Sequence, residues 1–328
     1  MNTLIHIVLK IIRKIYKRLS NQTQQNLQCV NNADEASKLI IDLLSKTTPC
    51  MITRFGSTEL NVISNYRGIK EHKHKFIKYI KGESPQWWWN EQGIKELFSC
   101  SGFFPTTENN IISFSNLMIN NIPNIDILGS WRPEEYYFKE ELKSCKLVSL
   151  RLLEPFWSSI PWTSILENKN ILVIHPFADT IEKQYKKREL LFTDKRILPT
   201  FKNFYTIKAI QSLGGYDKRF KTWFEALSWM EQTMDSINYD ICLIGCGAYG
   251  FPLAAHAKKQ GKKAIHLGGS LQLLFGIKGK RWESPYYGVK EWGIPIGSYT
   301  ALINEYWVHP SEDEKPTNAQ EVENACYW

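Results

Sequence analysis

In the second half of the chain, short apolar runs alternate with helical segments, and this alternation constrains the fold more than any other feature. The apolar runs lie in 169–177, 201–209, 239–245 and 263–268, and helices are expected over 179–190, 220–237 and 250–261. Apolar strands joined by helices are typical of a parallel sheet that is covered on both faces. The sequence therefore predicts an α/β, Rossmann-like fold with a mostly parallel sheet, whose ligands bind at the carboxyl ends of the strands.

The first half of the chain contains the same two kinds of segment in a less regular order. Helices are expected over 33–46, 71–82, 108–122 and 133–144, and strands within 49–56 and 126–131. The first of these strands is expected to run into a loop. From about residue 276 onward aromatic side chains dominate, and we expect this tail to wrap around the domain.

Residues 1–20 predict an amphipathic helix. At 100° per residue, nine apolar side chains fall within about 160° of arc and the five bases lie in the opposite half, with Ile7 as the one apolar exception. The segment is too short and too charged to span a bilayer, which needs roughly 20 apolar residues, but it suits an anionic membrane surface. The alternative is a helix that packs on its own domain. The apolar side chains are Leu4, Ile5, Val8, Leu9, Ile11, Ile12, Ile15, Tyr16 and Leu19, and the bases are Lys10, Arg13, Lys14, Lys17 and Arg18.

Charge and cysteine content indicate where the protein is located and which partners it can bind. The chain has 41 Lys and Arg against 33 Asp and Glu, a net charge of +8, and the five bases of the first 20 residues precede the first acid, Asp34. The remainder is nearly balanced, which disfavours a nucleic-acid binder. Seven cysteines without a CxxC pair favour a reducing compartment. We therefore expect a cytoplasmic protein on the inner face of the cytoplasmic membrane, with residues 21–33 as a linker to a domain over 34–328.

A glycine-rich turn follows the apolar run 239–245. Its sequence, Gly245-Cys246-Gly247-Ala248-Tyr249-Gly250, has the GxGxxG spacing that lets a backbone approach a phosphate at a helix N-terminus. A dinucleotide site also needs an acid after the next strand, and that strand ends in His266-Leu267-Gly268-Gly269. NAD is therefore not expected. The turn either contacts a nucleotide or phosphate, or its glycines only allow close packing of helix and strand.

A second turn follows the first buried strand and contains Arg54, Gly56, Ser57 and Glu59. The arginine offers a bidentate fork for phosphate, and the glycine permits close approach of the backbone. A carboxylate five positions after the arginine can accept a proton or hold a divalent cation. The competing interpretation is an ion pair between the arginine and the glutamate in an ordinary loop.

Further candidates lie near other strand ends. His175 ends the run 169–177 and can donate to a diphosphate or act as acid or base, although it can also merely orient its loop. Asp179 and Thr180 can cap the helix that follows. A basic cluster at Lys278, Lys280 and Arg281 suits phosphate or a solvated face.

The weakest candidates are aromatic and acidic. The three tryptophans at 87–89 can stack on sugar rings, but burial in the core is the commoner fate of such side chains. Glu154 and Asp126 lie near the ends of expected strands and can meet an acceptor, with capping or turn roles as the alternative.

The Arg54-x-Gly56-x-x-Glu59 pattern resembles the signature of bacterial glycosyltransferases with the GT-D type of Rossmann-like fold. Further segments resemble a family found in surface-polysaccharide gene clusters, and together they cover most of the chain from residue 50 to 328. One departure concerns the metal: the family carries Asp-x-Glu where this chain has Ser57-Thr58-Glu59. The further segments are GFFP, DILGSW, LEPFW, HPF, IGCGAYGFPLAAHAKKQGKKAIHLGG, LLFGIKGKRW, NEYWVHP and CYW.

The resemblance implies a glycosyltransferase that moves a sugar from a nucleotide-sugar donor to a lipid-linked or cell-surface glycan. Glu59 is expected to be the general base or the sole carboxylate ligand of a Mn or Mg ion, whose affinity should fall because Ser57 replaces an acid. Arg54, His175 and the segments at 245–250, 268–269 and 280–281 are expected around the donor. The alternatives are another activated-donor transferase on the same glycans, or a non-catalytic glycan-binding or assembly protein on the membrane.

Overall fold

A computed structural model describes residues 3–20, 27–71, 74–212, 219–316, 319–321 and 325–328 of the chain. Its centre is a seven-stranded sheet with the order β3-β2-β1-β7-β6-β4-β5, in which all neighbouring strands are parallel. The α/β, Rossmann-like fold predicted from the sequence is confirmed. The strands are β1 (Cys50–Arg54), β2 (Ile127–Ser130), β3 (Lys146–Ser149), β4 (Asn170–His175), β5 (Asn203–Lys208), β6 (Ile241–Ile244) and β7 (Lys263–His266).

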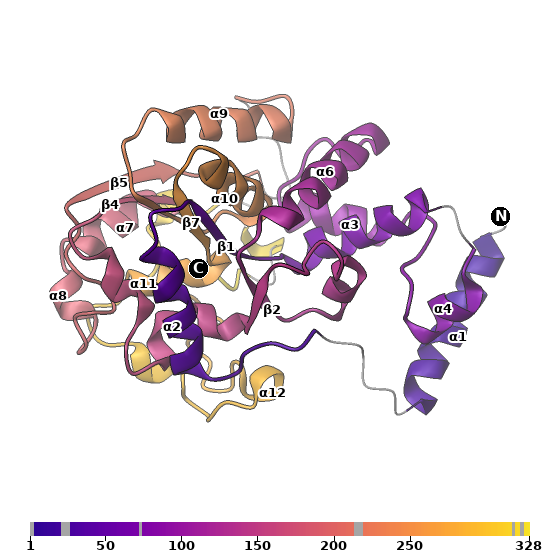
Figure 1. Ribbon diagram of the computed structural model, residues 1–328, viewed down its shortest axis with the longest axis horizontal. Helices are drawn as coiled ribbons and strands as arrows, with labels where there is room; N and C mark the ends of the chain where they lie inside the picture. Colours follow the sequence, from indigo (N-terminus) through magenta and orange to yellow (C-terminus); the bar gives the residue numbers. More distant parts are fainter. Residues whose placement is uncertain (1–2, 21–26, 72–73, 213–218, 317–318, 322–324) are drawn as a thin grey trace.

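Helices cover both faces of the sheet (Figure 1). Alternate strand residues point to opposite faces: Met51 and Leu172 belong to one buried cluster, whereas Ile52 and Ile171 belong to the other. The first face carries α3 (Ser57–Lys70), α5 (Glu91–Ser99), α6 (Glu108–Asn121), α9 (Trp223–Asp235) and α10 (Gly250–Lys259). The second carries α2 (Ala33–Leu44), α7 (Ala178–Tyr185), α8 (Arg188–Leu191) and α11 (Leu271–Leu274).

The aromatic tail packs on the second face. Trp282, Tyr299 and Trp307 are all buried in the cluster that also contains Ile171 and Val173 of β4. The tail consists mainly of short 3-10 turns and contains one short helix, α12 (Val289–Trp292). The prediction that the tail wraps around the domain is confirmed, and its last residues return to the carboxyl end of the sheet.

Several segments differ from the sequence prediction. The loop expected after β1 is a 14-residue helix, α3, so that Glu59 lies in a first helical turn. Its buried positions surround the helix and leave no amphipathic stripe, which is why the periodicity is weak. The helix expected over 133–144 is a 3-10 helix, Pro133–Phe138. The sequence prediction also omitted β3 and α5.

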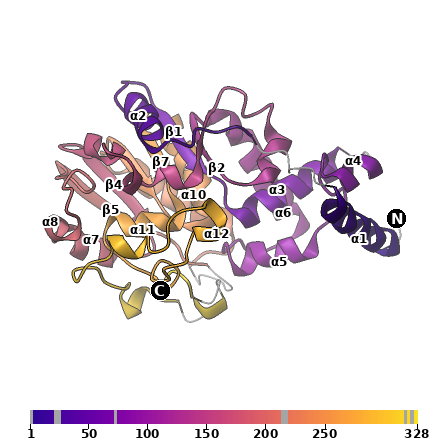
Figure 2. The same cartoon turned by 90° about the horizontal axis from the view of Figure 1, so that it is seen from below.

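The N-terminal helix α1 (Thr3–Leu19) lies beside α4 (Phe76–Lys81) at one end of the molecule (Figures 1 and 2). Residues 72–73 of the expected helix over 71–82 lie outside the described residues. Of the expected linker, residues 21–26 also lie outside them, while Val30 pairs with Val148 of the edge strand β3. In the described part of the chain, no helix has the length and apolar character needed to cross a bilayer.

Candidate functional site

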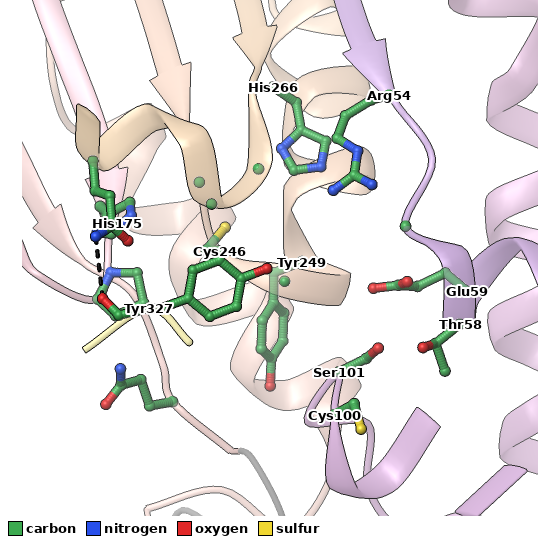
Figure 3. Close-up of a pocket in the computed structure, with 18 of the residues that line it drawn as sticks. Arg54, Thr58, Glu59, Cys100, Ser101, His175, Cys246, Tyr249, His266 and Tyr327 are labelled. Atoms are coloured by element: carbon green, nitrogen blue, oxygen red, sulfur yellow. Dashed lines mark hydrogen bonds between the residues drawn. The ribbon is translucent and has the colours of Figure 1, made fainter. Parts of the chain in front are cut away.

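A cleft opens at the carboxyl end of the sheet, where four neighbouring strands, β1, β7, β6 and β4, deliver one site segment each (Figure 3). The Arg54 turn and the Gly245 turn, which are about 190 residues apart in the chain, both line it because their strands are separated only by β7. The predicted residues that line the cleft are Arg54, Gly56, Ser57, Glu59, His175, Gly245, Gly247, Tyr249, Gly268, Gly269 and Arg281.

Arg54 ends β1 and is held by packing rather than by an ion pair. Its guanidinium carbon lies 5.1 Å from the ring centre of Trp131, whose indole N–H donates to the Phe55 carbonyl at 3.0 Å. A side chain at Gly268 would lie only 2.8 Å from Arg54 Nη1. No described carboxylate forms a salt bridge with Arg54, and its buried Nε has no hydrogen-bond partner among the described residues. The charge of Arg54 is thus available to an anion in the cleft.

Glu59 lies beside Arg54 in the first turn of α3, with only 6% of its surface exposed (Figure 3). A side chain at Gly56 would collide with the carboxylate, because its Cβ would lie 1.9 Å from Glu59 Oε2. Burial raises the pKa of Glu59 above its usual value, while its own backbone N–H, the charge of Arg54 and the hydroxyl of Ser101 oppose the shift. The carboxyl group is therefore a stronger base than one in water.

Two glycines of the turn, Gly245 and Gly250, make room for neighbouring side chains, and a third, Gly247, leaves its backbone open to the cleft. A side chain at Gly245 would lie 2.8 Å from the ring of His175, and one at Gly250 would lie 2.2 Å from the ring of His266. Gly247 has a φ of +54°, lines the cleft, and its Cβ position faces only the Ser101 carbonyl at 3.5 Å. Of the two interpretations left open by the sequence, close packing accounts for Gly245 and Gly250, whereas the backbone at Gly247 is accessible from the cleft.

His175, the last residue of β4, is 3% exposed and lines the cleft. The backbone N–H of Phe177 donates to its Nδ1 at 3.0 Å. Burial lowers the pKa of His175 to about 3, so the ring is neutral near pH 7. The geometry favours the hydrogen-bonding role of His175 over proton transfer.

The cap expected at the next helix comes from elsewhere in the chain. The carboxylate of Glu314 accepts from the backbone N–H groups of Asp179 and Thr180 at 2.9 and 3.2 Å. The prediction that Asp179 or Thr180 caps this helix is wrong, because both residues lie inside its first turn.

The C-terminal segment supplies the remaining wall of the cleft. The Tyr327 ring reaches into the middle of the cavity (Figure 3), and the guanidinium carbon of Arg281 lies 4.3 Å from its centre. The Tyr327 carbonyl accepts from Gln272 Nε2 at 3.1 Å, which fixes the segment against α11. Gly269 provides the space for the tyrosine ring, because its Cβ would lie 2.1 Å from Tyr327 Cε1.

The residues present do not fit a divalent cation. Glu59 is the only acidic side chain among the described residues that line the cleft. No group of three or more His, Cys, Asp or Glu side chains in the described ranges is placed to hold a metal ion. Hard cations prefer several oxygen ligands, and here one buried carboxyl group shares the cleft with the cations Arg54 and Arg281.

Other candidates from the sequence lie away from the cleft. Gly250 only makes room for His266, and Lys280 is exposed outside the lining. Lys278 pairs with Glu283 at 3.2 Å. Asp126 lies at the opposite end of the sheet, where Lys258 Nζ donates to it at 2.6 Å.

Glu154 and the tryptophans at 87–89 have structural partners. Glu154 accepts from Tyr299 Oη at 2.8 Å and from Trp157 Nε1 at 2.9 Å, and burial raises its pKa to about 7. Trp88 stacks on His6 of α1 with ring centres 4.1 Å apart. Trp88 thus forms part of the seat of α1, whereas Trp87 packs on Tyr79 and Trp89 stacks on Tyr66. None of the three lines the cleft.

Sequence reasoning missed His266, Trp131 and Ser101, which all line the cleft. His266 had a usable signal, since it ends the strand that follows the glycine turn. Trp131 likewise ends the expected strand over 126–131, whereas Ser101 had no such signal, because only the folded chain brings its segment to Glu59. Comparison of the chain with protein families, with curated proteins and with solved structures finds no match to any of them.

Proposed function

We propose that this protein is a glycosyltransferase that moves a sugar from a nucleotide-sugar donor to a lipid-linked or cell-surface glycan. The observation that carries the proposal is the shared cleft, in which the Arg54 turn and the Gly245 turn face one another at the carboxyl end of the sheet. This is the position at which open α/β sheets bind nucleotides. The signature that Arg54, Gly56 and Glu59 share with GT-D glycosyltransferases supports the same reaction class.

The donor diphosphate is assigned to the positive wall of the cleft. Arg54 Nε has no hydrogen-bond partner among the described residues. The amides at the start of α3 have no side-chain cap from Gly56, and of them the Glu59 N–H bonds its own carboxylate. A helix N-terminus and a guanidinium both stabilise phosphate, and each gains strength in a partly buried site. These groups neutralise the charge that develops when the diphosphate leaves.

Glu59 is assigned as the general base. The acceptor hydroxyl forms a bond to the anomeric carbon of the sugar, its proton passes to the Glu59 carboxylate, and the bond from the anomeric carbon to the diphosphate breaks with its electron pair on the diphosphate oxygen. Burial raises the pKa of Glu59 and so makes its carboxylate more basic, while the charge of Arg54 favours the ionised form. No step requires a metal ion.

The exposed face of α1 supports attachment to the membrane. The helix packs on α4, where Arg13 lies over the Tyr79 ring at 4.5 Å. His6 stacks on Trp88, and Leu9 is buried. The alternative of packing on its own domain is met in part, because this contact uses one edge of the helix and leaves most of its apolar arc exposed. The exposed side chains of the apolar arc are Leu4, Ile5, Val8, Ile11, Ile12, Ile15 and Leu19, each at 40% or more; Phe76 and Ile77 of α4 are exposed as well, and so is Ile7 on the opposite half of the helix.

A large apolar patch beside basic residues is typical of a membrane-binding surface. Lys10, Lys14, Lys17 and Arg18 are exposed on the neighbouring face of α1 and suit anionic headgroups. We therefore assign an anionic membrane surface as the partner of α1 and α4.

Binding of the donor is tested by isothermal titration calorimetry of the full chain with ribonucleoside diphosphates and nucleotide sugars, with and without manganese. The proposal expects saturable binding of at least one of them, and binding that Arg54→Gln weakens. Absence of binding across a broad panel would remove the donor assignment.

Cellular glycan separates the transferase from the non-catalytic alternative. Glu59→Gln and Arg54→Gln are expected to remove the glycan product while the protein stays folded and membrane-bound. A binding or assembly protein would instead tolerate both changes and fail when residues 1–20 are deleted.

Membrane attachment is tested by sedimentation with vesicles that contain anionic or only zwitterionic lipid. Ile11→Asp combined with Ile15→Asp is expected to reduce the bound fraction at least tenfold on anionic vesicles, because apolar burial is lost on two side chains that are 52% and 50% exposed. Ile296→Asp is the matched control, since Ile296 is 64% exposed on the aromatic tail. Equal binding of both variants would contradict the assignment.

A further inference from the structure

Two buried histidines on the wall of the cleft each have one ring nitrogen that no described residue engages. His175 is 3% exposed and His266 is 4% exposed, and both line the cleft. In each ring the backbone engages Nδ1, through the Phe177 N–H for His175 and the Ile244 carbonyl for His266. Each Nε2 is therefore the nitrogen left for a ligand.

The backbone partners fix the two rings in opposite tautomers. The Phe177 N–H donates to His175 Nδ1 at 3.0 Å, so the proton of that neutral ring is on Nε2. The Ile244 carbonyl oxygen can only accept, so His266 Nδ1, at 3.2 Å, carries the proton and Nε2 carries a lone pair. Burial lowers the pKa of both rings to about 3, so both stay neutral near pH 7. His175 thus offers one donor, and His266 offers one acceptor.

The place of His266 in the fold indicates what its acceptor meets. It is the last residue of β7, the strand that follows the glycine turn and α10, and it comes 21 positions after Gly245. In Rossmann nucleotide sites an acid about 20 residues after the turn accepts a ribose hydroxyl. Gly250 lets the His266 ring pack against the start of α10, since a Cβ there would lie 2.2 Å from the ring.

The neutral ring of His266 also leaves the charge of the neighbouring Arg54 unpaired. Arg54 and His266 lie side by side at the ends of β1 and β7 (Figure 3). An acid at position 266 would pair with Arg54 and reduce the positive charge available to the diphosphate. A neutral imidazole accepts a hydroxyl proton without competing for the guanidinium.

We propose that His266 Nε2 accepts a hydrogen bond from a ribose hydroxyl of the donor nucleotide, so that the cleft discriminates against a nucleotide that lacks this hydroxyl. The inference rests on the proposed function, because it requires a nucleotide in the cleft. It adds a specificity-determining residue that the Arg54 and Gly245 turns do not themselves supply.

The test measures affinity for the four ribonucleoside diphosphates and for the 2′-deoxy and 3′-deoxy analogues of the one that binds most tightly. Removal of one of the two hydroxyls is expected to weaken binding to the unmodified protein about tenfold, the effect of one neutral hydrogen bond. In His266→Phe that loss is expected to disappear, because the acceptor is absent from both complexes. His266→Gln restores an acceptor and is expected to regain part of the discrimination.

His256→Gln, on α10 outside the cleft lining, is the matched control and should discriminate like the unmodified protein. Thermal unfolding of each variant shows whether it is folded. Equal affinity of the unmodified protein for the ribonucleotide and both analogues, or full discrimination by His266→Phe, would overturn the inference and leave the proposed function standing. Absence of binding by every ribonucleoside diphosphate would overturn both.

Discussion

The two ends of the sheet use their polar groups in different ways. At the amino end, Asp126 accepts from the Met51 backbone N–H at 2.8 Å and from Lys258 Nζ at 2.6 Å, and Lys263 Nζ donates to the Leu44 carbonyl at 2.6 Å. These groups fix strands and helices to one another. Their hydrogen bonds therefore stabilise the fold.

At the carboxyl end, buried polar groups keep unused capacity. Arg54 Nε has no partner among the described residues, and His175 and His266 each use one ring nitrogen for the backbone. Glu59 is buried at a raised pKa. Such groups reduce stability unless a ligand completes their bonds. The comparison indicates that the amino end holds the fold together and the carboxyl end is built for a ligand.

We expect the largest difference between the two ends when a carboxylate is replaced at each and the rate of sugar transfer is measured. Glu59→Gln should lower the rate of sugar transfer by about 10²–10⁴-fold, the usual effect of losing a general base, with the free energy of unfolding unchanged or increased. Asp126→Asn, at the amino end, should lower the free energy of unfolding by about 1–3 kcal/mol and leave the rate per folded molecule intact. Enzyme assays and chemical denaturation measure the two quantities. A Glu59→Gln variant with full activity would break the comparison.

Acid should reveal the buried histidines at the carboxyl end. Because the pKa of His266 is about 3 in the folded chain and near 6.5 when unfolded, the unfolded chain binds more protons in this interval. The free energy of unfolding therefore falls as pH drops from about 6.5 toward 3. His266→Gln should remove roughly 2–3 kcal/mol of the loss between pH 6.5 and 4.5, at 1.36 kcal/mol per pKa unit.

The measurement is urea denaturation at both pH values, with the unmodified protein as the reference. The raised pKa of Glu59 acts in the opposite direction, because it lowers the free energy of unfolding as pH rises. This contribution is the same in the unmodified protein and in the variant, so it cancels in the comparison. An acid response in His266→Gln equal to that of the unmodified protein would contradict the burial argument.

Removing one cation from each end sharpens the comparison. Arg54→Gln should raise the dissociation constant of the ribonucleoside diphosphate about 10–100-fold, because a charge-assisted hydrogen bond contributes roughly 1.5–3 kcal/mol. Lys258→Gln removes a cation at the amino end and should leave that constant unchanged. Calorimetric titration of both variants measures this dissociation constant. Equal weakening by the two would indicate long-range electrostatics in place of direct contact.

The sequence predicted the sheet well because buried parallel strands are continuous apolar runs. The runs 169–177, 239–245 and 263–268 all contain strands of the structure. Helix α3 was missed because its buried residues, among them Glu59, Ser64 and Asn65, surround the helix and give no amphipathic period.

The candidate site could be predicted only where strands end in unusual residues. Arg54, His175 and the glycine turn follow apolar runs, so the parallel topology alone places them together. The approach of Trp131 to Arg54, of Ser101 to Glu59 and of Tyr327 to Gly269 depends on tertiary packing between distant segments. The sequence contains no local signal for such contacts.

Amide hydrogen exchange with and without the tightest-binding ribonucleoside diphosphate tests most directly whether the carboxyl end of the sheet is a nucleotide site. The account predicts slower exchange in the turns at 55–59, 245–250 and 267–270, with the amino end of the sheet unchanged. Unchanged exchange in all three turns at saturating nucleotide, or protection confined to other parts of the molecule, would contradict it.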